Sequence, residues 1–364
     1  MPHADPALLD RLLAEVALRR VNRRDAGDHA LFKYNTVQQL SREWNPVRRE
    51  ARGIVFHVPT ATVVCRPIRK FFNLDEDDET RLENLPRDVP ATVEEKLDGS
   101  CVAIHLRDDD VRCVTPGSFA SEQALWAEGE TRRRGLAPDD AFRAVVAGTT
   151  LVCEAIYPEN VSVVDYGDRR DLALLAAVDL DGREHPPAGV DALAARFGLS
   201  RPRRFDVAVS REMPVAPRDE GYVVSYWTGP VPVRVKVKGA EFLRLHPVVS
   251  DMTERSVLDL IETGRLAEFA DRMPRAARSQ ADDIAAALTQ RFRSLRARTD
   301  AVVAEVAGLP TRKEQALAVS RLAPDAEVRF LSFLALDGAL GDAQVWALVR
   351  KSLRCRADEP DAAG

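Results

Sequence analysis

Residues 94–100 read Glu-Glu-Lys-Leu-Asp-Gly-Ser. They end one strand-like run, ATVEEKL, and lead at once into another, CVAIHL, so the Asp-Gly pair predicts a turn between two antiparallel strands. Gly99 lets another group approach the backbone closely. The Lys96 amine is thereby expected at a strand end beside a turn, where a substrate can reach it. A hairpin that simply carries a solvated lysine is an equally good interpretation of this motif alone.

Lysine is scarce in this chain, which makes each lysine informative. Only seven of the 52 basic residues are lysines, and the other 45 are arginines. Arginine stays charged and is no nucleophile, whereas a lysine amine can lose its proton and attack an electrophile. We therefore expect lysines to mark positions that a guanidinium cannot serve. The seven are Lys33, Lys70, Lys96, Lys236, Lys238, Lys313 and Lys351.

A second cluster of basic residues lies in the segment Arg234-Val235-Lys236-Val237-Lys238. Strand alternation puts Arg234, Lys236 and Lys238 on one face and the valines on the other. Such a row repels itself unless an anion lies against it, and it lowers the pKa of an amine that faces it. The alternative is an edge strand that uses lysine to block aggregation, but the repeated use of a scarce residue favours a binding role.

Two carboxylates are also predicted on apolar strands. Glu154 interrupts the run Leu151–Tyr157, and Glu220 directly precedes Gly221-Tyr222-Val223-Val224. A carboxylate within an apolar strand is costly unless it faces a cleft or has a partner. Either acid alone is more often a strand-end charge, but together with the lysines they suggest a site for ribose and a divalent metal. Magnesium favours one or two carboxylates combined with substrate phosphates.

Composition excludes several classes of protein. The apolar fraction of 45% and the charged fraction of 30% fit a folded chain, and the net charge of −5 argues against a protein that coats nucleic acid without specificity. Five cysteines without a C-x-x-C pair exclude a disulfide scaffold and a cysteine zinc site. There is no P-loop signature. With no membrane-spanning stretch and no signal peptide in view, we expect a cytoplasmic protein without membrane association, and no obligate protein partner is inferred.

The pattern along the chain predicts two domains. After an amphipathic helix at 6–20, short strand-like runs dominate, including one at 161–166. Beyond His246-Pro247 helical segments replace the strands. We therefore expect an α+β domain with antiparallel sheets at 1–248, an all-α domain at 249–355 and a flexible tail at 356–364.

Taken in order, these motifs resemble those of the covalent nucleotidyltransferase superfamily, and most closely the bacteriophage T4 RNA ligase 1-like family of ATP-dependent RNA ligases. Five motifs in a workable order carry this resemblance, over roughly residues 30 to 246. The features that narrow it to this family are the upstream segments ARGIVF and RKFFN and the Pro-x-Asn of the third motif. The five motifs are Lys96–Ser100, Thr115–Phe119, Leu151–Asn160 with Val161–Val164 after it, Glu220–Val224 and Val235–Gly239.

The resemblance implies a nucleotidyltransferase (ATP-grasp-like ligase) domain followed by an α-helical C-terminal domain. It implies that ATP and Mg²⁺ are used, that Lys96 becomes adenylated, and that Glu220 handles the metal. It also assigns an ATP- or AMP-binding set, in which Lys70 contacts the outgoing pyrophosphate, Glu154 the ribose, the lysine pair the α-phosphate and Glu95 the adenine amino edge. This set comprises Arg52, Lys70, Glu95, Asp98, Gly99, Glu154, Lys236 and Lys238.

The implied activity is ATP-dependent joining of an RNA 5′-phosphate to a 3′-hydroxyl in RNA repair or processing, with a broken tRNA as one possible substrate. The alternatives are a polynucleotide adenylyltransferase, a DNA ligase, or a catalytically weakened RNA-binding relative. One departure favours the last of these: Pro116 stands where the family usually has a basic residue, so Arg112 or another arginine is expected to substitute.

Four arginines lie close together on one predicted helix of the C-terminal part. They form either an RNA contact or a solvated helix face. The four are Arg291, Arg293, Arg296 and Arg298.

Overall fold

The computed structural model describes residues 3–160, 163–250, 252–270 and 273–357. The chain divides into two compact units, Met1–Arg244 and Leu245–Gly364. The division lies inside helix α7 (Ala240–Ser250), whereas the sequence pattern put the boundary between residues 248 and 249. Of the expected tail, residues 358–364 lie outside the described residues, and 356–357 end the last helix.

The first sheet of the N-terminal unit is built entirely from antiparallel neighbours. In sheet order its strands are β1 (His3–Ala4), β5 (Thr62–Cys65), β4 (Arg52–His57), β3 (His29–Tyr34) and β2 (Val21–Ala26). Helix α1 (Pro6–Ala17) packs Leu8 and Leu12 against Phe32 and Phe56 on one face of this sheet. The opposite face, with Leu31, packs against the second sheet.

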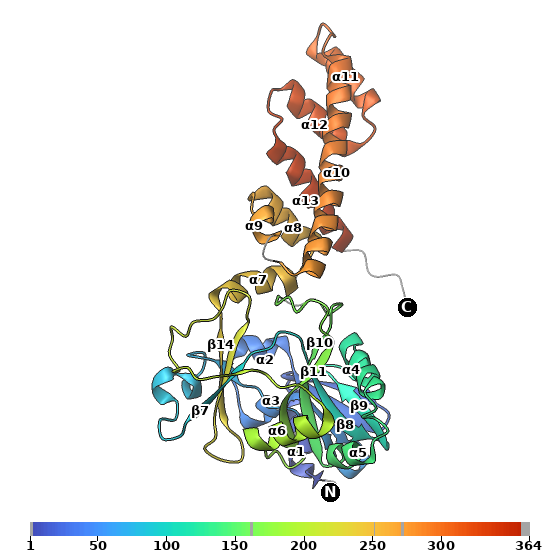
Figure 1. Ribbon diagram of the computed structural model, residues 1–364. Coiled ribbons are helices and arrows are strands. Elements are labelled where there is room, and N and C mark those ends of the chain that lie inside the picture. The colour runs from blue at the N-terminus through green and yellow to red at the C-terminus, as the bar shows by residue number, and fades with distance from the viewer. Residues whose placement is uncertain (1–2, 161–162, 251, 271–272, 358–364) are drawn as a thin grey trace. The chain divides into compact units, whose positions relative to one another are not determined.

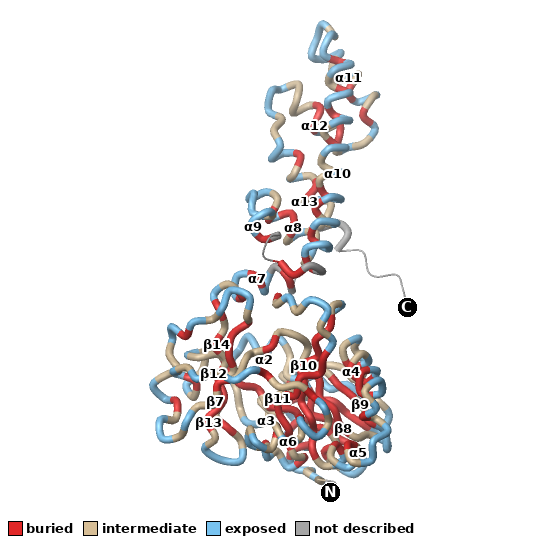
Figure 2. Tube along the Cα trace, viewed as in Figure 1, coloured by how far each residue is buried: buried red, intermediate tan, exposed pale blue. Residues whose placement is uncertain are grey.

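The second sheet forms the centre of the unit. Its antiparallel strands, in sheet order, are β11 (Asp171–Asp179), β10 (Thr149–Ile156), β8 (Ser100–Arg107) and β9 (Asp110–Val114). Every residue of β10 is buried, and the strands are drawn largely in red in Figure 2. Helices α4 (Glu122–Arg133), α5 (Asp140–Val146) and α6 (Pro187–Phe197) cover one face, as Figure 1 shows. Gly198 ends α6 in the left-handed conformation that glycine commonly adopts at the end of a helix.

The third sheet carries the basic strand. In sheet order it contains β12 (Arg204–Phe205), β7 (Ala91–Glu95), β13 (Gly221–Tyr226), β14 (Val233–Lys238) and β6 (Phe72–Asn73). β13 and β14 form an antiparallel hairpin, and β6 is the one parallel neighbour among the described strand pairs. The unit also contains α2 (Thr36–Ser41), α3 (Pro46–Glu50) and 3₁₀ helices at Val58–Thr60, Asp78–Thr80 and Leu82–Asn84.

These sheets and the helices that follow them confirm the expected α+β class with antiparallel sheets and a helical C-terminal part. The strand expected at 161–166 is wrong over its described part, 163–166, and 161–162 lie outside the described residues. The backbone N–H groups of Val163 and Val164 donate to the Asp98 carboxylate at 2.6 and 2.9 Å, not to a neighbouring strand. A side-chain acceptor thus competes with the ladder for these donors.

Among its described residues, the C-terminal unit contains helices and their connecting turns but no strand. Its helices after α7 are α8 (Glu254–Glu262), α9 (Leu266–Ala270), α10 (Arg275–Val306), α11 (Arg312–Leu322), α12 (Ala326–Leu336) and α13 (Asp342–Ala357). Three of the four clustered arginines on α10 have acidic partners: Arg291 with Glu327, Arg296 with Asp300 and Arg298 with Asp325. This pairing favours the solvated face over an RNA contact. No helix among the described residues is both long and apolar enough to cross a bilayer.

Candidate active site

A cavity of about 210 Å³ lies in the N-terminal unit where the second and third sheets meet. The turn between β7 and β8, which contains Lys96 and Gly99, forms one wall. Residues far apart in the sequence supply the others. The lining residues are Arg52, Ile68, Phe71, Glu94, Glu95, Lys96, Leu97, Gly99, Cys101, Glu154, Leu175, Pro202, Val223, Arg234 and Lys236. The structure thus brings six of the ten sequence-predicted site residues to one cavity, and the other four lie beside it or behind its wall.

Lys96 and Glu220 are held together by backbone and side-chain contacts. The Lys96 N–H donates to the Gly221 carbonyl at 2.9 Å, which ties the end of β7 to the start of β13. The Lys96 Nζ lies 2.6 Å from Glu220 Oε2, and the Lys238 Nζ lies 3.0 Å from the other oxygen, Oε1. The Glu220 side chain is only 3% exposed. A single buried carboxylate therefore bridges two of the predicted functional lysines.

Gly99 and Glu154 meet across the turn. The Gly99 N–H donates to Glu154 Oε1 at 3.0 Å. A Cβ at position 99 would lie 2.5 Å from the Ala155 carbonyl oxygen, so only glycine allows the turn to approach β10 this closely. Burial, together with the charges of Glu220 and Asp98, raises the pKa of Glu154 to about 7, although Lys96 and the Gly99 N–H oppose the shift. The Glu154 carboxyl faces the cavity, as the sequence predicted.

Asp98 is close to these groups but serves the backbone. Its carboxylate accepts the Val163 and Val164 N–H groups, and its own N–H donates to the Tyr166 hydroxyl at 2.8 Å. Burial and the nearby Glu220 raise the pKa of Asp98, against the hydrogen bonds that favour its charged form. Asp98 therefore fixes the segment after β10 against the Lys96 turn, and it does not line the cavity.

Three cations stand in or beside the cavity without an acidic partner. Within the described part of the chain, Arg52, Lys70 and Lys236 form no ion pair with a carboxylate. Burial, together with the charges of Arg52, Lys70, Lys96 and Lys238, lowers the pKa of Lys236 to about 6. The pKa of Lys70 is also lowered, and burial is the largest cause. Charges that repel each other in a partly desolvated site are stabilised when an anion binds between them.

Three cations lie close to the ring of Phe71 at the cavity wall. Its ring centroid lies 4.5 Å from Lys236 Nζ, 5.5 Å from the Arg234 guanidinium carbon and 6.0 Å from that of Arg52. Beside it, Lys70 Nζ lies 4.7 Å from the Phe72 ring and 5.6 Å from the Trp44 ring. Aromatic faces attract cations without neutralising them. The aromatic rings of the RKFFN segment thus lie against four cations in or beside the cavity.

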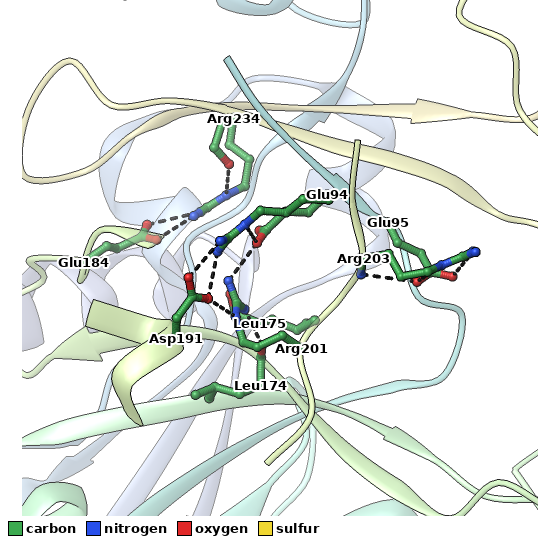
Figure 3. A network of polar contacts seen from close by, with 11 residues as sticks. Glu94, Glu95, Leu174, Leu175, Glu184, Asp191, Arg201, Arg203 and Arg234 are labelled. Carbon is green, nitrogen blue, oxygen red and sulfur yellow. Dashed lines mark hydrogen bonds and ion pairs between the residues drawn. The ribbon is translucent and has the colours of Figure 1, made fainter. Parts of the chain in front are cut away.

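The strand β14 alternates as predicted, but its positive row is partly neutralised by the protein itself. Val235 and Val237 enter the apolar cluster of the third sheet, while Arg234 and Lys236 face the cavity. Arg234 pairs with buried Glu184 at 2.7 Å, as Figure 3 shows, and Lys238 pairs with Glu220. Of the three charges, only Lys236 lacks an acidic partner among the described residues.

Sequence reasoning missed a network of ion pairs behind Glu94 and Glu95. Glu94 accepts from Arg201 at 2.7 Å, and Glu95 pairs with the exposed Arg203 at 2.8 Å (Figure 3). Asp191 on α6 joins the network through Arg201. The partners lie about a hundred residues from β7, and no local pattern in the sequence signals such pairs. Through the carboxylates of Glu94 and Glu95, the network holds the end of β7, directly before Lys96, in place.

Comparison with known proteins supports the resemblance stated above. Residues 50–214 match the family model described as RNA ligase. That range contains Lys96 and Glu154 but ends before Glu220 and the two lysines of β14. A putative RNA ligase of Thermovibrio ammonificans is 30% identical over 220 residues, which cover 59% of this chain and 57% of the relative. RNA ligase 1 of bacteriophage TS2126 is 36% identical over 127 residues, 33% of this chain and 30% of that protein.

Two RNA ligases of known structure are less similar in sequence to this chain than the two relatives above. An archaeal ATP-dependent RNA ligase is 15% identical, with a TM-score of 0.47 over 91% of this chain and 96% of that one. A mutant Naegleria gruberi RNA ligase with ATP and Mn is 18% identical, with a TM-score of 0.37 over 43% of this chain and 52% of that one. This chain spans well under two thirds of the length of the two relatives matched by sequence. Over residues 50–214, the chain is similar to the RNA ligases of the bacteriophage T4 RNA ligase 1-like family.

Proposed function

We propose that this protein is an ATP-dependent RNA ligase that works through AMP bonded covalently to Lys96. The observation that carries the proposal is the cavity itself. It is lined by Lys96, by Glu154, and by Arg52 and Lys236, which have no acidic partner among the described residues. A nucleophile beside an anion-binding set is what transfer of a nucleotide from ATP requires.

In the first step the neutral Lys96 amine attacks the α-phosphorus of ATP. The N–P bond forms, the bond from that phosphorus to the bridging oxygen breaks, and pyrophosphate leaves. The amine must lose a proton, and Glu220 Oε2, at 2.6 Å, is the carboxylate in hydrogen-bonding reach to accept it. Negative charge that develops on the phosphate is stabilised by Lys236 and Lys238.

The remaining cavity residues bind and orient the nucleotide. Arg52 and Lys70 hold the departing phosphates, because their charges have no acidic partner of their own among the described residues. Glu154 accepts from a ribose hydroxyl. Glu95 meets the adenine amino edge at the rim of the cavity, and Gly99 leaves the space in which the nucleotide approaches the turn. Asp98 acts indirectly, since it holds the backbone of this turn.

The carboxylates fit a magnesium ion that arrives with ATP. The charge of Glu220 raises the pKa of both Glu154 and Asp98, so the three carboxyl groups lie close together. Among the described residues no set of three or more His, Cys, Asp or Glu side chains forms a complete metal site. Glu220 would hold the ion together with phosphate oxygens, and the ion would neutralise charge on the leaving pyrophosphate.

The later steps use RNA. The AMP passes from Lys96 to an RNA 5′-phosphate, so that a phosphoanhydride forms and the N–P bond breaks. A 3′-hydroxyl then attacks the RNA phosphorus, AMP leaves, and a phosphodiester seals the strand. Repair or processing of cleaved RNA in the cytoplasm, including tRNA, is the role we assign to this reaction.

A product assay separates this proposal from its alternatives. Protein is incubated with ATP, Mg²⁺ and 5′-phosphorylated single-stranded RNA, and in parallel with DNA of the same sequence. Joined or circular RNA is the expected product. Joined DNA alone would identify a DNA ligase, and adenylylated but unjoined RNA would identify an adenylyltransferase. A binding relative without activity would give no covalent adduct and no product, which would overturn the proposal.

ATP binding is expected to be coupled to proton uptake through Lys236. The lowered pKa of about 6 means that this amine is largely neutral at pH 7.5 in the free protein. A bound phosphate favours the charged form, so binding takes up as much as about one proton, and affinity falls as pH rises above 6. Calorimetry at pH 7.5 in buffers of different ionisation enthalpy, on Lys96→Ala protein that cannot react, measures this uptake. Lys236→Met should abolish it, and equal uptake in both variants would exclude Lys236 as its source.

A further inference from the structure

A second cavity, of about 150 Å³, opens on the first sheet of the N-terminal unit. Its charged lining residues are both basic, Arg24 and Lys33, and in the described residues neither forms an ion pair with a carboxylate. The rest of the lining is mostly polar and supplies amide and hydroxyl groups. The lining residues are Asn22, Arg24, Leu31, Lys33, Tyr34, Asn35, Thr36, Gln39 and Gly117.

A β-bulge aligns this cavity with the active site. Phe32 pairs with Ile54, but Lys33 pairs with Arg52, so Gly53 is the extra residue between them. Across the other edge of β3, Lys33 pairs with Asn22. Residues directly opposite in an antiparallel sheet share a face. Asn22, Lys33 and Arg52 therefore form one row across three strands, which leads from the second cavity to the wall of the first.

The bulge is held by the turn that contains Pro116. Gly53 has a φ of +95°, and a Cβ there would lie 2.8 Å from the Pro116 Cα. The turn closes through the Thr115 N–H, which donates to the Ser118 carbonyl at 3.0 Å. A Cβ on Gly117 would lie 3.1 Å from Lys33 Nζ, so the Lys33 side chain extends along this turn. Pro116 stands where the family usually has a basic residue, and the Lys33 side chain from β3 lies beside the same turn.

Lys33 is also the one lysine of residues 1–244 that the nucleotide site leaves unused; the other four are Lys70, Lys96, Lys236 and Lys238. The arginine expected to replace a cation near Pro116, Arg112, instead pairs with Asp110 at 2.9 Å and with Glu128 at 3.5 Å. Tyr34, which lines the second cavity, is hydrogen-bonded to Arg52. A free positive charge is therefore available at Lys33, next to the nucleotide site and outside it.

We propose that the second cavity binds a phosphate of the RNA strand that is to be joined, with Lys33 as its main cation and Arg24 as its second. Asn22 and Thr36 offer hydrogen bonds to the adjoining ribose, whose hydroxyls are both donors and acceptors. The row through Lys33 to Arg52 then directs the strand end toward Lys96. This inference rests on the function proposed above, because it names how that same reaction holds its RNA.

The test compares Lys33→Ala with Lys33→Arg and with Arg11→Ala. Arg11 is exposed on α1 and has no ion-pair partner among the residues described, so its removal matches the change in net charge. The ATP step is measured as adduct formation with labelled ATP. The RNA step is measured separately, as sealing of pre-adenylylated single-stranded RNA without ATP, over a series of salt concentrations.

Lys33→Ala is expected to raise the apparent KM for this RNA about tenfold, with adduct formation unchanged within about twofold. Its dependence of log KM on log salt should be shallower by roughly 0.7, the value for one phosphate contact on a single strand. Lys33→Arg should restore both quantities, and Arg11→Ala should resemble the wild type. An unchanged RNA step would overturn the inference while leaving the ligase intact. A loss of adduct formation alone would assign the charge to ATP and overturn it equally.

Discussion

Lys96→Ala protein is expected to form no covalent adduct with α-labelled ATP, a reduction of at least about a thousandfold. The variant removes the amine at the turn and leaves Arg52 and Lys236 in place, so ATP should still bind. Lys96→Arg should be equally inactive, because a guanidinium keeps the positive charge beside Glu220 but does not attack phosphorus. The measurement is label retained on the protein after denaturing gel electrophoresis.

Lys313→Ala provides the matched control, because Lys313 is an exposed lysine on α11 of the other unit. It should be labelled as strongly as the wild type. Undiminished labelling of Lys96→Ala would remove Lys96 as the nucleophile, whatever the RNA assays show. Loss of labelling together with loss of the folded signal in circular dichroism would call for the arginine variant, which keeps the ion pair with Glu220.

Glu220→Ala is expected to slow adduct formation by about a hundredfold or more and to change its dependence on Mg²⁺. The carboxylate is buried and contacts Lys96 at 2.6 Å and Lys238 at 3.0 Å. Its removal leaves two ammonium groups without their counter-charge, which costs roughly 3–5 kcal/mol of stability in a buried pair. It also removes the acceptor nearest the attacking amine. Adduct formation is measured as a function of magnesium concentration, and stability by denaturant unfolding.

A buried carboxylate elsewhere separates the two effects. Glu130 on α4 is 5% exposed and accepts from Arg133 and Arg134, each at 2.6 Å. Glu130→Ala should lower the free energy of unfolding, as is expected for Glu220→Ala, but should leave adduct formation and its magnesium dependence as in the wild type. A wild-type magnesium titration for Glu220→Ala would remove Glu220 from the reaction and leave it a structural role.

Much of this site could be predicted because strand alternation is local. The pattern of β14 correctly separated Val235 and Val237 from the basic residues. The antiparallel pairing suggested around the Asp-Gly pair is wrong, because β7 and β8 lie in different sheets. The α+β class followed from the same alternation, together with the helical spacing after residue 246. In each case the information lies within a few residues of the chain.

The pairings between distant segments could not be predicted from such patterns. Nothing near Arg234 indicates that Glu184 neutralises it, or that Asp98 holds the backbone of Val163 and Val164. Alternation suggested a row of three charges that repel each other, whereas the fold supplies two of them with carboxylates. Lys236 is the clearest example of such an effect. Its pKa is lowered by burial and by cations from four different segments of the chain, and most of this cannot be recognised from the sequence around it.

The bulge at Gly53 shows the same limit on a smaller scale. A regular register would have paired Lys33 with Gly53, and one extra residue moves Arg52 opposite Lys33. The sequence contains a glycine at this position but no sign that the Pro116 turn packs against it. Register is set by packing between segments, so the row from Asn22 to Arg52 becomes visible only in the folded chain.

Mass spectrometry of protein incubated with ATP and Mg²⁺ tests the central claim most directly. Digestion at mildly alkaline pH preserves the phosphoramidate. It should yield a peptide that contains residues 94–100 and carries one AMP on the Lys96 side chain. The same peptide from protein incubated without ATP should carry none. An adduct on any other lysine, or an unmodified Lys96 peptide while RNA is being joined, would contradict the account.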